Sequence, residues 1–126
     1  MNIDFMKTYN QTKESIENEL IQFAGLIKKA TEANCITSET FEKCKGYADS
    51  LNIEIQSLNE GKELFTKCIE SISKDNYKQV IKERLLHNKK WDDVAAAVGY
   101  TKKHIQTSIY PVALKEFEVH LQCTHS

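Results

Sequence analysis

Side chains that can contact DNA gather between Thr101 and Thr107. Lysine can donate to guanine or neutralise a phosphate, and the amide of Gln106 could form two hydrogen bonds with adenine. On the exposed side of a helix, such side chains would project into the major groove. The residues expected to bind DNA are Lys89, Lys90, Thr101, Lys102, Lys103, His104, Gln106 and Thr107.

Part of this set would contact the DNA backbone rather than the bases. Lys89 and Lys90 precede the first of two expected helices, and the helix N-terminus at Thr101 could receive a phosphate. Four lysines at phosphates predict that log K falls with log salt with a slope of roughly −3 to −4. The alternative is that residues 101–107 form the solvated face of an ordinary helical bundle.

A helix-turn-helix is the element that would hold these side chains. Trp91, Val94 and Val98 recur on one side of an expected short helix. Gly99 can take the left-handed conformation that ends a helix, and Thr101 can cap the next one. The segment therefore predicts a short helix, a tight turn and a second helix at a steep angle.

A longer pattern surrounds this turn. A helix ends near Arg84, and a short basic loop, a Trp-acid-acid-Val-Ala helix from Trp91, a Gly-Tyr-Thr turn and an Ala-Leu-x-x-Phe helix at 113–117 follow. With this pattern, residues 77–117 resemble sigma factor region four, as it occurs in small phage and prophage transcription activators of the ArpU and RinA type. The resemblance implies an all-α domain that binds promoter DNA and works with RNA polymerase.

The end of the second helix departs from the family pattern. Ser108 stands where the family has an apolar residue, and Ile109 follows it. Pro111 has no N–H to bond back to Thr107, and it biases Tyr110 away from helical conformation. We therefore predict that the recognition helix ends near residue 109 or 110 and that Pro111 begins a separate final helix.

The first 73 residues carry the pattern of long amphipathic helices. After a loose lead-in over residues 1–9, a helix over 12–33 and a second helical stretch over 38–73 are expected, with Thr37 or Ser38 as the cap between them. The second stretch is either one helix, which could form a coiled coil, or two helices broken at 59–61. The apolar stripe of the first helix is Ile16, Leu20, Phe23, Ile27 and Ala30.

The second stripe would be buried by another helix. The expected oligomer seam is Phe41, Leu51, Ile55, Leu58 and Phe65, and its partner would be a second copy of the chain. The alternative is packing within the chain, with helix 12–33 folded back as an antiparallel hairpin. Asp75 is the expected cap of the helix that follows, which runs to Leu86.

Composition restricts the class of protein. Residues 1–72 carry 8 Lys and 12 acidic residues, whereas residues 73–126 carry 9 basic and 6 acidic residues, so the net charges are −4 and +3. The difference favours an anionic partner for the second half. Four Gly and one Pro favour an all-α fold, with a hairpin or coiled coil over 1–73 and a helix-turn-helix bundle over 74–126.

Two functions are compatible with this pattern. The first is a DNA-binding transcription regulator that acts at promoters with RNA polymerase in the bacterial cytoplasm. The alternative is an inhibitor or adaptor that binds protein and keeps the fold without reading DNA, which the sparse Arg and the long apolar stripe favour. No catalytic motif, cofactor site or membrane span is recognised, and His120, Cys123 and His125 match no zinc spacing.

Overall fold

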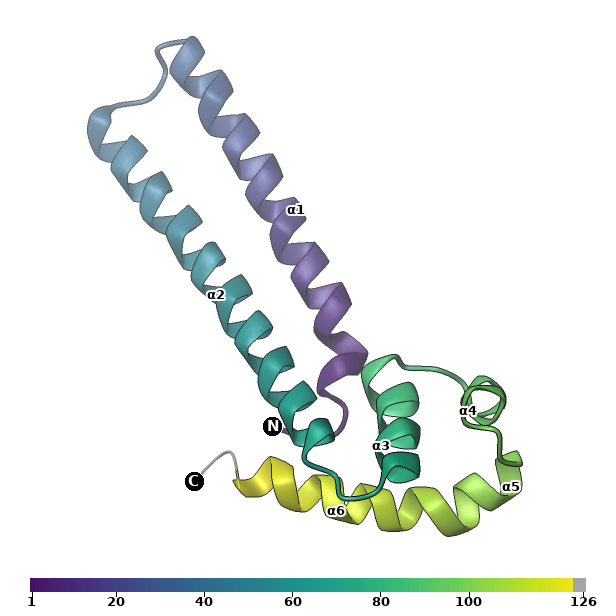
Figure 1. Ribbon diagram of the computed structural model, residues 1–126. Helices are drawn as coiled ribbons and strands as arrows, with labels where there is room; N and C mark the ends of the chain where they lie inside the picture. Colours follow the sequence, from purple (N-terminus) through teal and green to yellow (C-terminus); the bar gives the residue numbers. More distant parts are fainter. Residues whose placement is uncertain (124–126) are drawn as a thin grey trace. The chain divides into compact units, whose positions relative to one another are not determined.

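The computed structural model describes residues 1–123, which form helices joined by short connections (Figure 1). No strand occurs in residues 1–123, so the predicted all-α fold class is confirmed. None of the helices in that range combines the length and apolar character that a membrane span requires. The elements are α1 (Phe5–Glu32), α2 (Ser38–Glu70), α3 (Asp75–Ile81), η1 (Lys82–Leu86), α4 (Trp91–Val98), α5 (Lys102–His104), η2 (Ile105–Ile109) and α6 (Tyr110–Cys123), where η1 and η2 are π-helical.

The chain divides into two compact units that interleave in sequence. One unit is residues 9–60, and the other joins residues 1–8 to the chain from Gly61 onward. The sequence-based division ended the first part at residue 73, whereas the contacts group the last turns of α2 with the C-terminal helices. We call the two groups the hairpin unit and the C-terminal unit.

In the hairpin unit, α1 and α2 run antiparallel (Figure 1). The Tyr9 hydroxyl donates to Asn59 Oδ1 at 2.7 Å, and the rings of Phe23 and Tyr47 pack edge to face with their centroids 4.9 Å apart. In the connection, Thr37 caps α2, because its Oγ1 accepts from the backbone N–H of Thr40 at 3.2 Å. The hairpin that the two stripes predicted is therefore present.

The long helices correct two details of the sequence-based interpretation. α2 runs without a break through residues 59–61, so the one-helix alternative is confirmed and the two-helix alternative is wrong. The expectation of a loose lead-in over residues 1–9 is also wrong, since α1 begins at Phe5 and Met6 is buried. The Phe5 ring lies so close to Gly61 that a Cβ there would come within 2.7 Å of Phe5 Cζ.

The core of the C-terminal unit connects distant parts of the chain. The ring of Phe65 packs 6.0 Å from that of Phe5 and 5.0 Å from that of Phe117, between centroids. A second cluster, formed by Val80, Val94, Ile105 and Ile109, extends the core to α4 and η2. Aliphatic side chains from three elements, α3, α4 and η2, therefore position the segment 91–109.

The helix over 75–86 is present as α3 followed by η1, but its cap differs from the expectation. Lys74 occupies the N-cap position without a side-chain hydrogen bond, and Asp75 is the first helical residue. The prediction that Asp75 caps this helix is therefore wrong. In the first turn, its carboxylate instead lies near the positive end of the helix dipole, where a negative charge is favourable.

The predicted break at Pro111 does not occur. α5, η2 and α6 are continuous from Lys102 to Cys123, and Tyr110 has helical angles of φ −60° and ψ −46°. The Tyr110 N–H bonds to the carbonyl of Ile105, five residues back. Proline lacks an N–H and its ring meets the carbonyl four residues back in a regular α-helix, so the wider π turn preceding Pro111 lets the helix continue.

The π turn also explains the shifted apolar pattern. Because a regular α-helix has about 3.6 residues per turn, residues spaced four apart gradually move around the helix and away from the buried side. A wider π turn keeps residues with this spacing closer to one side. The inward position therefore falls on Ile109 rather than Ser108. The buried residues of this continuous helix are Ile105, Ile109, Ala113, Phe117 and Leu121.

Candidate nucleic-acid interface

Two helices joined by a three-residue turn carry the predicted contact residues. α4 ends at Gly99, which has φ 79° and donates its N–H to the Ala95 carbonyl at 3.0 Å. The side chain of Thr101 then accepts from the backbone N–H of His104 at 3.2 Å, which caps α5. The left-handed glycine and the threonine cap thus hold the turn as the sequence predicts.

Buried aliphatic residues determine which side of the second helix faces solvent. Ile105 and Ile109 are buried against Val80 and Val94, on the inner side. The opposite side is exposed and carries the residues expected to read DNA, which are Lys102, Lys103, His104, Gln106 and Thr107. The structure therefore brings these five side chains together on one exposed surface, which we call the polar surface.

Several polar groups of this surface already have partners. The Thr107 hydroxyl donates to the Lys103 carbonyl at 2.7 Å, and the His104 ring lies 5.5 Å from that of Tyr100. Lys102 forms an exposed ion pair with Asp92 at 3.3 Å. An exposed ion pair of this kind is weak and can exchange for a phosphate, so Lys102 remains a candidate contact.

The two lysines before α4 differ in their surroundings. Lys89 forms an ion pair with Glu83, whose side chain is only 10% exposed. Lys90 is exposed and makes no ion pair within residues 1–123, and Lys103 shares both properties. Because Lys89 neutralises a buried carboxylate, two or three lysines, rather than four, remain for phosphates.

Arg84 and Trp91 connect this region to α6, which the sequence did not indicate. The Arg84 guanidinium lies 4.5 Å from the centroid of the Trp91 ring, and that ring packs edge to face on Tyr110 at 4.8 Å. Arg84 also donates to the Lys89 carbonyl at 2.8 Å. Trp91 is therefore a half-buried packing residue at the start of α4.

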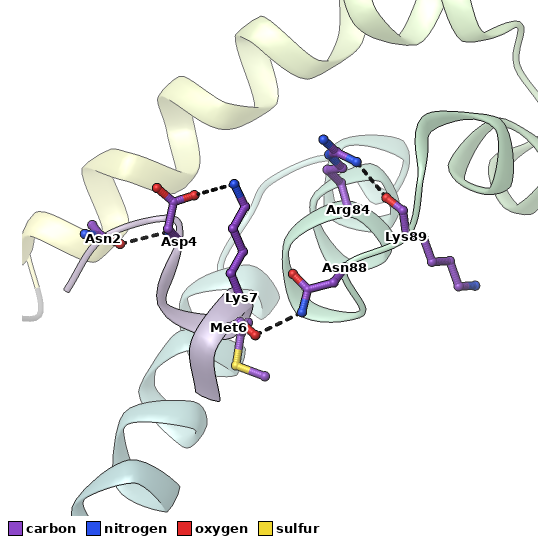
Figure 2. A network of polar contacts seen from close by, with 7 residues as sticks. All are labelled: Asn2, Asp4, Met6, Lys7, Arg84, Asn88 and Lys89. Carbon is purple, nitrogen blue, oxygen red and sulfur yellow. Dashed lines mark hydrogen bonds and ion pairs between the residues drawn. The ribbon is translucent and has the colours of Figure 1, made fainter. Parts of the chain in front are cut away.

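The N-terminal residues also contact the basic loop. Asn88, which has a positive φ of 55°, donates its side-chain N–H to the Met6 carbonyl at 2.9 Å (Figure 2). Lys7 forms an ion pair with Asp4 at 3.1 Å in the same network. The apolar Phe5 and Met6 were the available signal that residues 1–8 belong to a folded unit.

The residues of the expected oligomer seam differ in exposure. Phe65 is fully buried between aromatic residues of its own unit, so its side chain is not available to a second chain. Leu51 is buried in the hairpin unit, Ile55 and Leu58 are half-buried, and Phe41 is 42% exposed. Packing within the chain therefore uses at least part of this stripe.

Within residues 1–123, no group of side chains is arranged to hold a metal ion. His120 Nε2 lies 3.9 Å from a carboxylate oxygen of Glu116. His125, the third member of the tail trio, lies outside the described residues.

Comparison of the chain with protein-family models, with curated proteins and with solved structures finds no match.

Proposed function

We propose that the protein is a DNA-binding transcription regulator of the phage or prophage type. In this proposal α4, the turn at 99–101 and α5–η2 form a helix-turn-helix, and the polar surface enters the major groove. The observation that carries the proposal is the exposure of Lys103, Gln106 and their neighbours together, opposite the buried Ile105 and Ile109.

Each side chain would have a distinct role on DNA. Gln106 would bond adenine, Lys102 and Lys103 would bond guanine or phosphate, and Lys90 would contact the backbone beside the groove. With Lys89 held by Glu83, two or three phosphate contacts give a salt slope of about −2 to −3 in log K against log salt. Through its resemblance to sigma region four, the regulator would act at promoters with RNA polymerase, in the cytoplasm of a bacterial host.

A second candidate is an inhibitor or adaptor that binds protein and does not read DNA. The ion pairs of Lys89 and Lys102 favour it, because they reduce the free positive charge near the turn. Apolar side chains of α6, Val112 at 51% and Val119 at 54% exposure, offer a surface for such a partner. This candidate predicts no retention of any DNA fragment.

A gel-shift titration tests the first candidate against the second. We expect one fragment from the region upstream of the gene to be retained more strongly than a scrambled fragment, with a complex that weakens as salt rises. Gln106→Ala should weaken binding about fivefold or more, as expected for loss of one bidentate base contact. Lys115→Ala, an exposed lysine of α6, is the matched control and should leave affinity unchanged.

The same titration can contradict the proposal. Equal retention of the specific and scrambled fragments, with Gln106→Ala indistinguishable from Lys115→Ala, would show that the polar surface does not read sequence. No retention by a chain that is helical in circular dichroism would favour the protein-binding candidate.

A further inference from the structure

A pocket of about 330 Å³ lies in the C-terminal unit, between residues 3–7, the end of η1 and the start of α6. Its volume is at the small end of the roughly 300–1,000 Å³ range of ligand sites. The polar side chains that line it are Asp4, Lys7, Arg84, Asn88 and Tyr110. In Figure 2 the side chains of Lys7 and Arg84 extend from the first two of these segments in the same direction.

Arg84 has N–H donors at this pocket that make no hydrogen bond to the described part of the chain. It is the single arginine of the chain, and within residues 1–123 it pairs with no carboxylate. One of its N–H groups donates to the Lys89 carbonyl, and one face of the guanidinium covers the Trp91 ring. A guanidinium has five N–H donors in a planar fork that matches the oxygens of phosphate or carboxylate. Its remaining donors are therefore suited to an oxyanion in the pocket.

Lys7 and Tyr110 add donors to the same pocket. The Lys7 ion pair with Asp4 is more than half exposed on both sides, at 63% and 56%, so a ligand can replace it at little cost. The Tyr110 hydroxyl forms no hydrogen bond within residues 1–123. Burial raises the pKa of this hydroxyl, which keeps it protonated as a donor at neutral pH.

Asp4 distinguishes between kinds of oxyanion. Its carboxylate lines the pocket and would repel a fully deprotonated sulfate or a phosphodiester. A phosphate monoester at neutral pH is partly protonated, because its second pKa is near 6, and its P–OH can donate to the carboxylate. We propose that this pocket binds the phosphate group of a small phosphomonoester, with Arg84, Lys7 and Tyr110 as donors and Asp4 as the acceptor of its proton.

Trp91 provides a direct signal for this site, because it is the single tryptophan of the chain and stacks on Arg84. Inorganic phosphate is titrated into the full chain at about pH 6.5, near the second pKa of a phosphate group, and at constant ionic strength. The fluorescence of Trp91 should change and then reach saturation. Sulfate at the same ionic strength should bind at least about tenfold more weakly, since it has no proton for Asp4. Lys7→Met and Tyr110→Phe should each weaken phosphate binding severalfold.

Control variants make the assignment specific. Lys103→Met removes an exposed lysine of the polar surface and should leave phosphate binding unchanged. Asp4→Asn should abolish the preference for phosphate over sulfate. Absence of saturation, equal binding of sulfate and phosphate to the unaltered chain, or equal effects of Lys7→Met and Lys103→Met would each overturn the proposal.

The phosphate titration does not depend on the proposed regulator function. If the chain binds DNA, Lys7→Met should retain its DNA affinity while losing phosphate affinity. Loss of both together would reassign the pocket to a phosphodiester of the DNA backbone and overturn the proposal of a monoester site. If the chain binds no DNA, the phosphate and sulfate titrations still decide the question.

Discussion

At the scale of single residues, the ion pair between Glu83 and Lys89 limits the basic surface before α4. The Oε2 atom of Glu83 is buried, and it makes no other hydrogen bond within residues 1–123. Leaving a buried carboxylate without a partner lowers the stability of the fold by more than forming its ion pair adds to that stability. Lys89 is therefore held in the folded chain by its ion pair with Glu83, although it lies near the candidate nucleic-acid interface.

Lys89→Met should lower the free energy of unfolding by about 1–3 kcal/mol, because it leaves the Glu83 carboxylate without its partner. Urea denaturation followed by Trp91 fluorescence measures the change. Lys90→Met, which removes a neighbouring exposed lysine, should change stability by less than about 0.5 kcal/mol. Similar losses in the two variants would contradict the role given to the ion pair.

Glu116 couples the joint before α3 to pH. Ser73 donates its backbone N–H at 2.8 Å and its hydroxyl at 3.2 Å to the two carboxylate oxygens. The backbone hydrogen bond is the main reason that the pKa of Glu116 lies below its usual value of 4.5. A pKa that is lowered by folding contributes stability above the unfolded value and loses it as pH falls through the folded value.

At about pH 7, well above the pKa of Glu116 in both the folded and the unfolded chain, Glu116→Gln should therefore unfold at a lower temperature than the unaltered chain. The difference should shrink as pH falls below about 4.5 and vanish once the carboxyl is protonated in both states. Thermal melts followed by circular dichroism across this range measure it. A difference that stays constant down to the lowest pH would show that the carboxylate charge is not involved.

At the scale of elements, α2 contains two glycines with opposite surroundings. A Cβ at Gly46 would meet nothing within 4 Å, whereas a Cβ at Gly61 would lie 2.7 Å from the Phe5 ring. Alanine stabilises a helix interior by about 1 kcal/mol relative to glycine where space allows. The same substitution is therefore expected to have opposite consequences at Gly46, near the start of α2, and at Gly61, nearer its end.

Gly46→Ala should raise the free energy of unfolding by roughly 0.5–1 kcal/mol, and Gly61→Ala should lower it because the Phe5 ring must move. Denaturant titrations of both variants, followed by circular dichroism, compare them directly. A gain of stability in Gly61→Ala equal to that in Gly46→Ala would mean that Phe5 does not occupy the space beside the glycine.

Periodicity and turn chemistry were enough to predict most of the elements. The stripes predicted the hairpin, and Gly99 with Thr101 predicted the turn, because each depends on local geometry. The continuation of the helix through Pro111 was not predictable from the proline rule, since that rule assumes a regular α-helix and a wider π turn precedes Pro111 here. The Arg84 stacking and the Glu83 ion pair depend on tertiary contacts that no local pattern encodes.

At the scale of the whole molecule, the C-terminal unit is built from two separate pieces of sequence. Residues 1–8 contribute Met6, which is 2% exposed, and Phe5, which packs on Phe65. A substitution near the start of the chain should thus affect helices that follow more than fifty residues later. Such a substitution should lower the stability of the C-terminal unit, whereas a substitution within residues 9–60 should act on the hairpin unit.

Met6→Ala should destabilise the C-terminal unit by about 2–5 kcal/mol, the usual range for truncating a buried methionine. The loss should appear in the denaturant midpoint of Trp91 fluorescence, since Trp91 belongs to that unit. Lys7→Ala, at an exposed neighbouring position, is the control and should have little effect. An unchanged midpoint in Met6→Ala would show that residues 1–8 do not support the unit.

The interleaving of the two units has a consequence for synthesis on the ribosome. The segment 1–8 is translated well before Phe65, on which Phe5 packs, and before Phe117, which packs on Phe65. The hairpin unit, whose residues are contiguous, can fold as it emerges, since its contacts close within 9–60. The C-terminal unit must wait for contacts of long sequence separation, which slow folding. During that interval the apolar residues of the first turn of α1 are exposed to chaperones and to other nascent chains.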